Sequence, residues 1–211
     1  MVITYHGGNC IKVSAGDTTL VFSPISKNSK QLKPTNFGAD IVFVSTNHPD
    51  MNGIEQVARG DKEPFVVGGP GEYEIGSVFA SGFLTHSQYG GKELTNTVYT
   101  VVFDGITAVY LGALSDTKLP NEVIEDVDTI DVLFVPIGGD GVLSASEAQH
   151  LAVYLEAKIV IPIHYGAIGE KDALKRFLKE AGAEGAAALE KLTIKPKDVA
   201  DKSGEVVVLS A

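Results

Sequence analysis

Short apolar stretches, separated by glycine turns, run through the first part of the chain. They predict three strands of an antiparallel meander, at Val2–Tyr5, Ile11–Ser14 and Thr19–Phe22. The next segment, Ser26–Gly38, is polar and has little periodicity, so we expect an exposed loop there, lying over a nearby site. A continuous apolar run, Ile41–Val44, then predicts a buried strand.

The middle of the chain also consists of short apolar stretches separated by turns. A short amphipathic helix is expected at Gly53–Arg59, ending at Gly60. Further strands are expected at Phe65–Val67, Val78–Leu84, Asn96–Phe103 and Thr107–Leu111, the last two joined by a turn at Asp104-Gly105. The glycines of Gly68–Gly76 lack the Lys-Ser/Thr ending of a phosphate-binding loop, and we interpret them as turns between strands.

The second half alternates apolar strands with helices. Strands are predicted at Val132–Pro136 and Lys158–Ile163, and shorter ones at Leu192–Lys195 and Glu205–Leu209. Helices are predicted at Pro120–Glu125, Ser144–Ala157 and Lys171–Ala181, the second with the Ser144 and Glu147 of a capping box. This mixture predicts an α/β fold: a four-layer αββα sandwich of two mixed β-sheets flanked by helices, as one domain over residues 1–211.

Composition narrows the classes of protein to consider. Hydrophobic residues make up 44% and charged residues 21%, and the formal charge is -10, which predicts a globular chain without a basic nucleic-acid surface. Cys10 is the single cysteine, so an internal disulfide is excluded. No apolar run approaches the ~18 residues of a membrane span. We therefore expect a cytoplasmic protein that binds neither nucleic acid nor membrane.

Three of the five histidines come directly after a predicted strand: His48, His86 and His164. A fold that gathers strand ends at one sheet edge would bring them together, and neutral imidazole is both a common metal ligand and a common buried hydrogen-bonding group. The sequence thus leaves open a shared site or three separate structural histidines. His6, before two glycines, is interpreted as a turn residue, and His150 as a surface or packing residue.

Two carboxylates accompany the histidines. Asp50 lies two residues after His48, a spacing that lets both side chains of a tight loop point to one centre. It could equally cap the following helix or form an Asx-turn. Asp116 also follows a strand, where it could supply a carboxylate, cap the helix that begins near Pro120, or be solvated.

Several stretches together resemble the metallo-β-lactamase superfamily, and within it the compact hydrolase-like branch that includes ascorbate-phosphate lactonase-type proteins. They extend over nearly the whole chain: Ile3–Gly7, Leu20–Pro24, Gly69–Glu74, Asn96–Tyr99, Asp131–Gly139 and Ile161–Tyr165. The resemblance implies the αββα fold and a centre that holds zinc or a similar metal.

The family's metal motif, His-x-His-x-Asp-His, falls on residues 46–51. His48 and Asp50 match it, whereas Thr46 and Met51 stand where the resemblance requires histidine. Later ligand positions fall on His86 and His164. The bridging aspartate falls on Ala113, and only a shifted alignment gives that role to Asp116. Ser23 likewise replaces the aspartate of the family's Asp-Pro turn.

Two functions follow from this partial match. In the first, His48, Asp50, His86 and His164 bind one divalent metal, zinc, manganese or iron, which activates water against an ester, lactone or phosphoester; Asp50 and Asp116 are the catalytic carboxylates. In the second, no metal binds, and the chain is a catalytically inactive pseudoenzyme, a ligand- or protein-binding module. A catalytic zinc needs about three protein ligands, which makes the losses at Thr46 and Met51 decisive.

Overall fold

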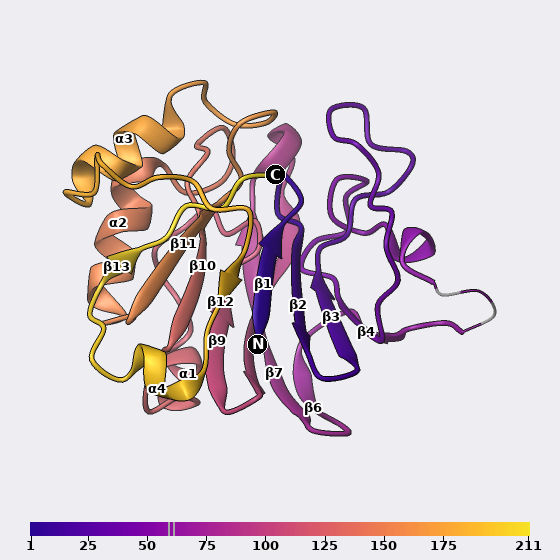
Figure 1. Ribbon diagram of the computed structural model, residues 1–211. Helices are drawn as coiled ribbons and strands as arrows, with labels where there is room; N and C mark the ends of the chain where they lie inside the picture. Colours follow the sequence, from indigo (N-terminus) through magenta and orange to yellow (C-terminus); the bar gives the residue numbers. More distant parts are fainter. Residues whose placement is uncertain (59, 61) are drawn as a thin grey trace.

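Two mixed β-sheets pack face to face in the computed structural model, which describes residues 1–58, 60 and 62–211 (Figure 1). The six-stranded sheet has the order β12 (Leu192–Thr193), β1 (Val2–Tyr5), β2 (Ile11–Ala15), β3 (Thr18–Phe22), β4 (Ile41–Phe43) and β5 (Phe65–Val67). Strands β1, β2 and β3 form the predicted antiparallel meander. Strands β4 and β5 continue it in parallel.

The seven-stranded sheet is built from strands that begin at Gly71. Its order is β13 (Glu205–Val206), β11 (Ile159–Ile163), β10 (Val132–Pro136), β9 (Ile106–Tyr110), β8 (Leu94–Phe103), β7 (Val78–Ser87) and β6 (Gly71–Ile75). Strands β6 to β9 pair antiparallel, and β9, β10, β11 and β13 pair parallel. The predicted hairpin at Asp104-Gly105 is confirmed as the β8–β9 connection. Residues 68–76, predicted as turns, instead contain β6, because Glu72 to Ile75 pair with β7 despite the surrounding glycines.

The core between the sheets is apolar and rich in aromatic rings. Phe22 stacks on Phe43 and on Tyr110, with ring centroids 4.8 Å apart in both pairs, and Phe43 meets Tyr99 edge-on at 5.2 Å. These rings come from both sheets and are fully buried. Aromatic pairs of this kind add to the free energy of burial, so they fix the two sheets against each other.

The outer faces of the sheets are covered differently. Three helices, α1 (Asn121–Glu125), α2 (Ala145–Tyr154) and α3 (Ala173–Glu180), bury apolar side chains against the seven-stranded sheet. Loops and the 3-10 turn η1 (Ile54–Gln56) cover the six-stranded sheet. The amphipathic helix predicted at Gly53–Arg59 is therefore wrong in type, since only one tight turn forms; Arg59 lies outside the described residues.

The capping box of α2 is confirmed, because the Ser144 side chain accepts from the Glu147 N–H and the Glu147 carboxylate accepts from the Ser144 N–H.

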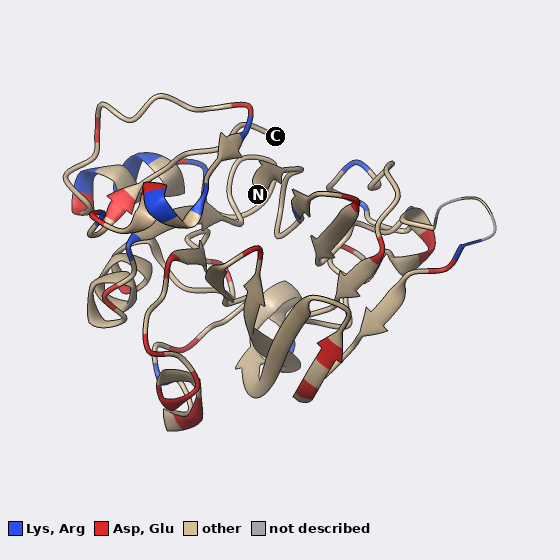
Figure 2. Ribbon diagram, turned by 60° about the horizontal axis from the view of Figure 1, so that its bottom comes forward, with Lys and Arg blue, Asp and Glu red and all other residues tan. Residues whose placement is uncertain are grey.

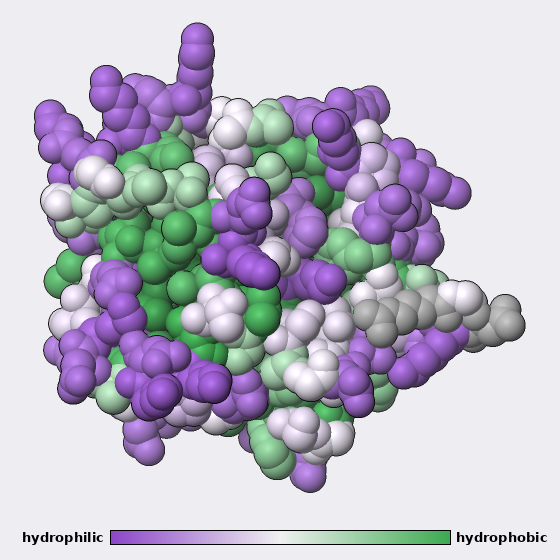
Figure 3. Space-filling view, viewed as in Figure 1, coloured by the Kyte–Doolittle hydropathy of each residue, from purple (hydrophilic) through white to green (hydrophobic). Residues whose placement is uncertain are grey.

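The helix α4 (Pro196–Val199) and two short strands complete the chain. None of the helices in the described chain is long and apolar enough to cross a membrane. Figure 3, which has the view of Figure 1, shows apolar surface concentrated on the side of the molecule that carries α2, β11 and β13. With its two mixed sheets and flanking helices, the molecule has the predicted fold class.

Candidate functional site

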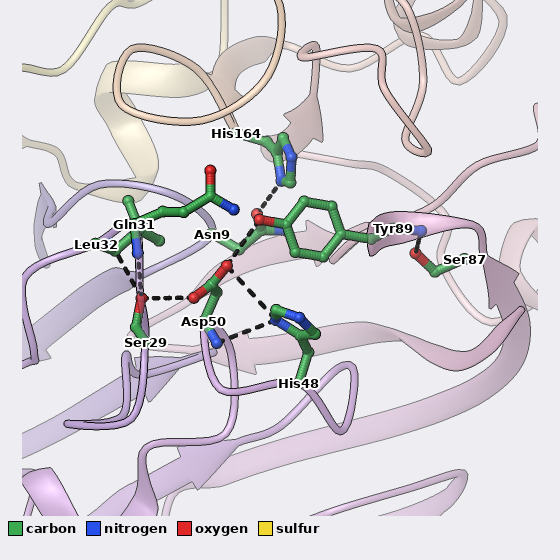
Figure 4. A network of polar contacts seen from close by, with 9 residues as sticks. All are labelled: Asn9, Ser29, Gln31, Leu32, His48, Asp50, Ser87, Tyr89 and His164. Atoms are coloured by element: carbon green, nitrogen blue, oxygen red, sulfur yellow. Dashed lines mark hydrogen bonds and ion pairs between the residues drawn. The ribbon is translucent and has the colours of Figure 1, made fainter. Parts of the chain in front are cut away.

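Tyr89 lies at the centre of a cluster of polar side chains at one rim of the sandwich (Figure 4). It begins the 3-10 turn η2 (Tyr89–Gly91), directly after β7, and its side chain is almost fully buried. Its ring meets the ring of His48 edge-on, with centroids 4.9 Å apart, and meets that of His164 in the same way at 4.9 Å. The tyrosine therefore lies between two of the predicted metal ligands.

The third predicted ligand, Asp50, is the acceptor in this cluster. The Tyr89 hydroxyl donates to Asp50 Oδ2 at 2.7 Å, and the Ser29 hydroxyl donates to Asp50 Oδ1 at 2.5 Å. Asp50 is 2% exposed, so these two donors replace the water that a carboxylate needs. Burial and the bond to Asp50 raise the pKa of Tyr89, which keeps the phenol protonated as a donor.

His48 closes the cluster on the solvent side. Its Nδ1 accepts from the Asp50 N–H at 3.2 Å and lies 3.5 Å from Asp50 Oδ2. The side chain is 30% exposed. An imidazole whose Nδ1 accepts a hydrogen bond carries its proton on Nε2, so in this arrangement Nε2 is a donor.

His164 is fully buried at the end of β11, with a left-handed backbone at φ 60°. A backbone of this kind is strained for histidine and persists only where its surroundings hold it. The residue is fixed by Nδ1, which lies 2.5 Å from Asn9 Oδ1, and by its N–H, which donates to the Gly8 carbonyl. Burial lowers the pKa of His164 to about 3, so the ring is neutral at pH 7. Nε2 has no hydrogen-bond partner among the described residues.

Glycines of the loop after β10 allow the close packing of this cluster. A Cβ on Gly138 would lie 2.6 Å from His164 Cδ2, and a Cβ on Gly141 would lie 2.9 Å from Tyr89 Cα. Both distances are shorter than real contacts, so a larger residue at either position would displace His164 or the backbone at Tyr89. The close packing of this site therefore explains why glycine occupies positions 138 and 141.

A second network fills the positions where the family resemblance requires further ligands. Asn96 is buried at its centre: its amide oxygen accepts from the Thr46 hydroxyl at 3.0 Å and from the Ala113 N–H at 2.9 Å. Its Nδ2 donates to Thr85 Oγ1 at 2.8 Å and to the Leu111 carbonyl at 3.0 Å. All four hydrogen bonds of the amide are therefore made.

Met51, at the other position expected to be histidine, is fully buried in the apolar cluster that covers the six-stranded sheet. Its neighbours in that cluster include Ile25, Val57 and Ala113. A thioether suits such an environment, whereas an imidazole would need a hydrogen-bond partner there. At both positions where the resemblance expects histidine, the side chain is therefore satisfied by its protein surroundings.

His86 and Asp116 lie apart from the cluster around Tyr89. His86 does not follow β7 as predicted but lies within it, because pairing with β8 continues to Ser87. Its side chain is 65% exposed and 3.7 Å from Glu93. Asp116 is also exposed and accepts from the Lys118 N–H at 2.9 Å. Both residues line a cavity of about 680 Å³ that opens beside the rim.

The described residues do not fit a metal ion. Within the described chain, no group of three or more His, Cys, Asp or Glu side chains is arranged to hold one. His48, Asp50 and His164 all contact Tyr89, which lies between the two imidazole rings. The Tyr89 hydroxyl also donates a hydrogen bond to the Asp50 carboxylate. The metal-ligand roles of His48, Asp50, His86 and His164 therefore stay a prediction from the resemblance.

Sequence reasoning missed three residues of the site: Asn9, Ser29 and Tyr89. Tyr89 follows a strand by two residues and precedes Gly90 and Gly91, a signal of the same kind that singled out the histidines. Ser29 belongs to the segment that was expected to be an exposed loop over the site. That segment does reach the site, but Leu32 and Thr35 within it are buried.

Comparisons with known proteins agree with this fold. A family described as "Beta-lactamase superfamily domain" matches residues 2–164. A UPF0173 metal-dependent hydrolase of Bacillus licheniformis is 29% identical, with 78% of this chain and 85% of that protein covered. A protein of Listeria monocytogenes that bears the same family description is also 29% identical, with the same coverage.

Solved structures give the same result. A Thermotoga maritima protein assigned to the Zn-dependent hydrolases of the metallo-beta-lactamase superfamily superposes with a TM-score of 0.74. The two chains are 28% identical, and the match covers 99% of this chain and 97% of that one. The similarity therefore extends past the matched domain to the last strands.

Proposed function

The chain belongs to the metallo-β-lactamase superfamily, and on that premise we propose that it is a binding module in which a tyrosine-centred cluster of side chains replaces the catalytic metal. Similar proteins of Bacillus licheniformis and Listeria monocytogenes are described as metal-dependent hydrolases. In this chain the fold is kept and the donor set is altered. This is the pseudoenzyme alternative of the two functions that the sequence left open.

One observation carries the proposal: the Tyr89 hydroxyl donates to Asp50 at 2.7 Å while its ring contacts both His48 and His164. A metal held by those three residues would need the space and the carboxylate oxygen that the tyrosine takes. A buried carboxylate with two short hydrogen bonds is satisfied without a cation. The Asp50 carboxylate thus has its donors from Ser29 and Tyr89, without a metal.

Metal binding tests the proposal directly. Protein purified without chelator is offered Zn²⁺, Mn²⁺ or Fe²⁺ in turn, passed through a desalting column, and its metal content measured by mass spectrometry. We expect far less than one metal per chain with each ion, because too few free ligands converge. One tightly held metal per chain would overturn the proposal.

A restored variant provides the positive control. Thr46→His, Met51→His and Ala113→Asp together bring back the residues of the family motif, and Tyr89→Ala clears the space between the ligands. We expect this variant to retain zinc under the same conditions. Circular dichroism and a measured melting temperature establish that it is folded before its metal content is read.

The second candidate is a hydrolase that binds a metal through His48, Asp50 and His164. One feature favours it: His164 is neutral and buried, and its Nε2 lacks a partner among the described residues, as a ligand nitrogen would before metal binds. Tyr89 would then have to leave Asp50. Under this function the substrate would be an ester, lactone or phosphoester, and the same metal measurement distinguishes the two candidates.

A further inference from the structure

Three cavities lie next to one another on the side of the seven-stranded sheet that α1 and α2 cover, from the end of β7 to the end of α2, and we call this row of cavities the groove. It consists of three neighbouring cavities of about 680, 540 and 440 Å³. The first and second share Lys118, Leu119 and Asn121. The second and third share Ile124 and Tyr154. Because each cavity shares lining residues with the next, the three adjoin one another in a row.

The floor of the groove is apolar where α1 and α2 meet. Ile124 is 40% exposed and Tyr154 is 69% exposed, although both belong to helices that otherwise pack inward. Leu119 and Leu151 line the same stretch. An exposed tyrosine beside an exposed isoleucine is an arrangement that anchors partner side chains in protein interfaces.

Acidic residues surround this apolar floor. Lys118 is the one Lys or Arg among the described lining residues, whereas four carboxylates line the groove: Asp116, Asp128, Glu147 and Glu156. Helix α1 adds Glu122 and Glu125, and it projects at the lower left of Figure 2 with acidic but no basic residues. The whole chain has 27 acidic and 17 basic residues, so the ratio of acidic to basic residues is much higher in the groove than in the chain as a whole.

We propose that this groove binds an extended peptide segment of a partner protein, carrying apolar side chains interspersed with Lys or Arg. The inference rests on the proposed function, since it names what the binding module would bind. The acidic rim complements basic side chains and repels nucleic acid and anionic membrane surfaces. A row of three adjoining cavities suits an extended chain, with Ile124 and Tyr154 as the apolar contact points.

The end of the groove at β7 comes within one residue of Tyr89 in the sequence, although the side chains of the Tyr89 cluster do not line it. Its lining includes Gln88, the residue before Tyr89, together with His86 and Asp116. These two predicted site residues thus gain a role that needs no metal, as polar contacts for the end of the peptide. They are exposed and free to reorient.

Selection from a phage-displayed library of random peptides about twelve residues long tests the proposal on the full-length protein. We expect the selected peptides to be enriched in Lys or Arg and in Leu, Ile or Phe. A synthetic, fluorescein-labelled copy of the most frequent peptide then serves as the probe in anisotropy titrations. Its affinity should fall with rising salt, because charge attraction contributes to binding.

Matched variants locate the binding site. Tyr154→Ser should weaken binding of the labelled peptide about tenfold, as expected for an anchor residue, and Ile124→Ser should act similarly. Val153→Ser is the control, because Val153 is 65% exposed on the same helix but lines a different cavity. The double substitution Asp128→Asn and Glu156→Gln should flatten the salt dependence.

Four results would overturn the proposal: no selected peptide, acidic selected peptides, equal effects of Tyr154→Ser and Val153→Ser, or self-association of the chain that Tyr154→Ser abolishes. The last would make the occupant a second copy of this chain. Stoichiometric metal in the wild-type protein would overturn the proposed function alone, since peptide binding at the groove is measured separately.

Discussion

The residues predicted to share one site fall into two groups with opposite surroundings. Asp50 and His164 are buried, and with His48 they pack around Tyr89. His86 and Asp116 are exposed at the mouth of a cavity. Both groups follow or end strands, so position in the sequence alone did not distinguish them.

The difference shows what burial does to a polar residue. In the inner group each carboxylate oxygen must have its donor, so the geometry is fixed and a change to one residue affects the others. In the outer group water can replace any partner, so each residue changes independently. The inner group should therefore govern stability, and the outer group should affect binding.

Asp50→Ala should give the largest effect. It leaves the hydroxyls of Ser29 and Tyr89 without their acceptor in a buried site, and we expect a loss of about 2–4 kcal/mol in the free energy of unfolding, measured by urea denaturation. Tyr89→Phe, which removes one of the two donors, should cost less. A loss below about 1 kcal/mol for Asp50→Ala would contradict the tight coupling of the inner group.

Acid should destabilise the inner group through His164, whose pKa in the folded state is about 3, against 6.5 in the unfolded chain. Between these values the unfolded chain binds the extra proton. The contribution of neutral His164 to the free energy of unfolding is therefore complete above pH 6.5, and it falls as the pH drops toward 3. From pH 7 to pH 5 we expect a loss of roughly 2 kcal/mol from this residue, measured by urea denaturation at each pH.

The His164→Asn variant isolates this effect, since asparagine tolerates the left-handed backbone. It should be less stable at pH 7 yet lose less stability between pH 7 and pH 5 than the wild type. His150 is exposed, and the control variant His150→Asn should keep the wild-type dependence of stability on pH. Equal pH dependence in wild type and His164→Asn would show that His164 is not held neutral.

The outer group should give the smallest effects. His86→Ala and Asp116→Ala each remove an exposed side chain, and we expect changes within about 0.5 kcal/mol in the free energy of unfolding. Thermal unfolding followed by circular dichroism measures this. If either variant lost more than about 1 kcal/mol, the separation of the two groups would be wrong.

The sequence predicted most strands and the helices α1, α2 and α3 close to their observed bounds, and it failed at β6 and in the region after Gly53. Val2–Tyr5 and Val132–Pro136 were predicted at their observed bounds because alternation and continuous apolar runs report burial directly. Strand β6 was missed because its glycines indicate turns, while pairing with β7 decides its conformation. The region after Gly53 forms one 3-10 turn, since loops and not a helix cover that sheet.

For the site, the sequence could predict which side chains carry chemistry but not which of them meet. His48, Asp50, His86 and His164 were predicted together; the first, second and fourth lie around Tyr89, whereas His86 is exposed elsewhere. Tyr89 was missed because an aromatic residue in a loop is ordinarily a packing residue, and its contact with Asp50 joins positions 39 residues apart. A contact over that separation depends on the tertiary fold, which local patterns do not encode.

The buried amide of Asn96 limits how this interior can change. It makes all four of its hydrogen bonds, two of them with Thr46 and Ala113, the positions where the resemblance places metal ligands. Changing Thr46 to histidine would remove one of those bonds and crowd a packed interior. Selection on one mutation at a time would therefore act against that change.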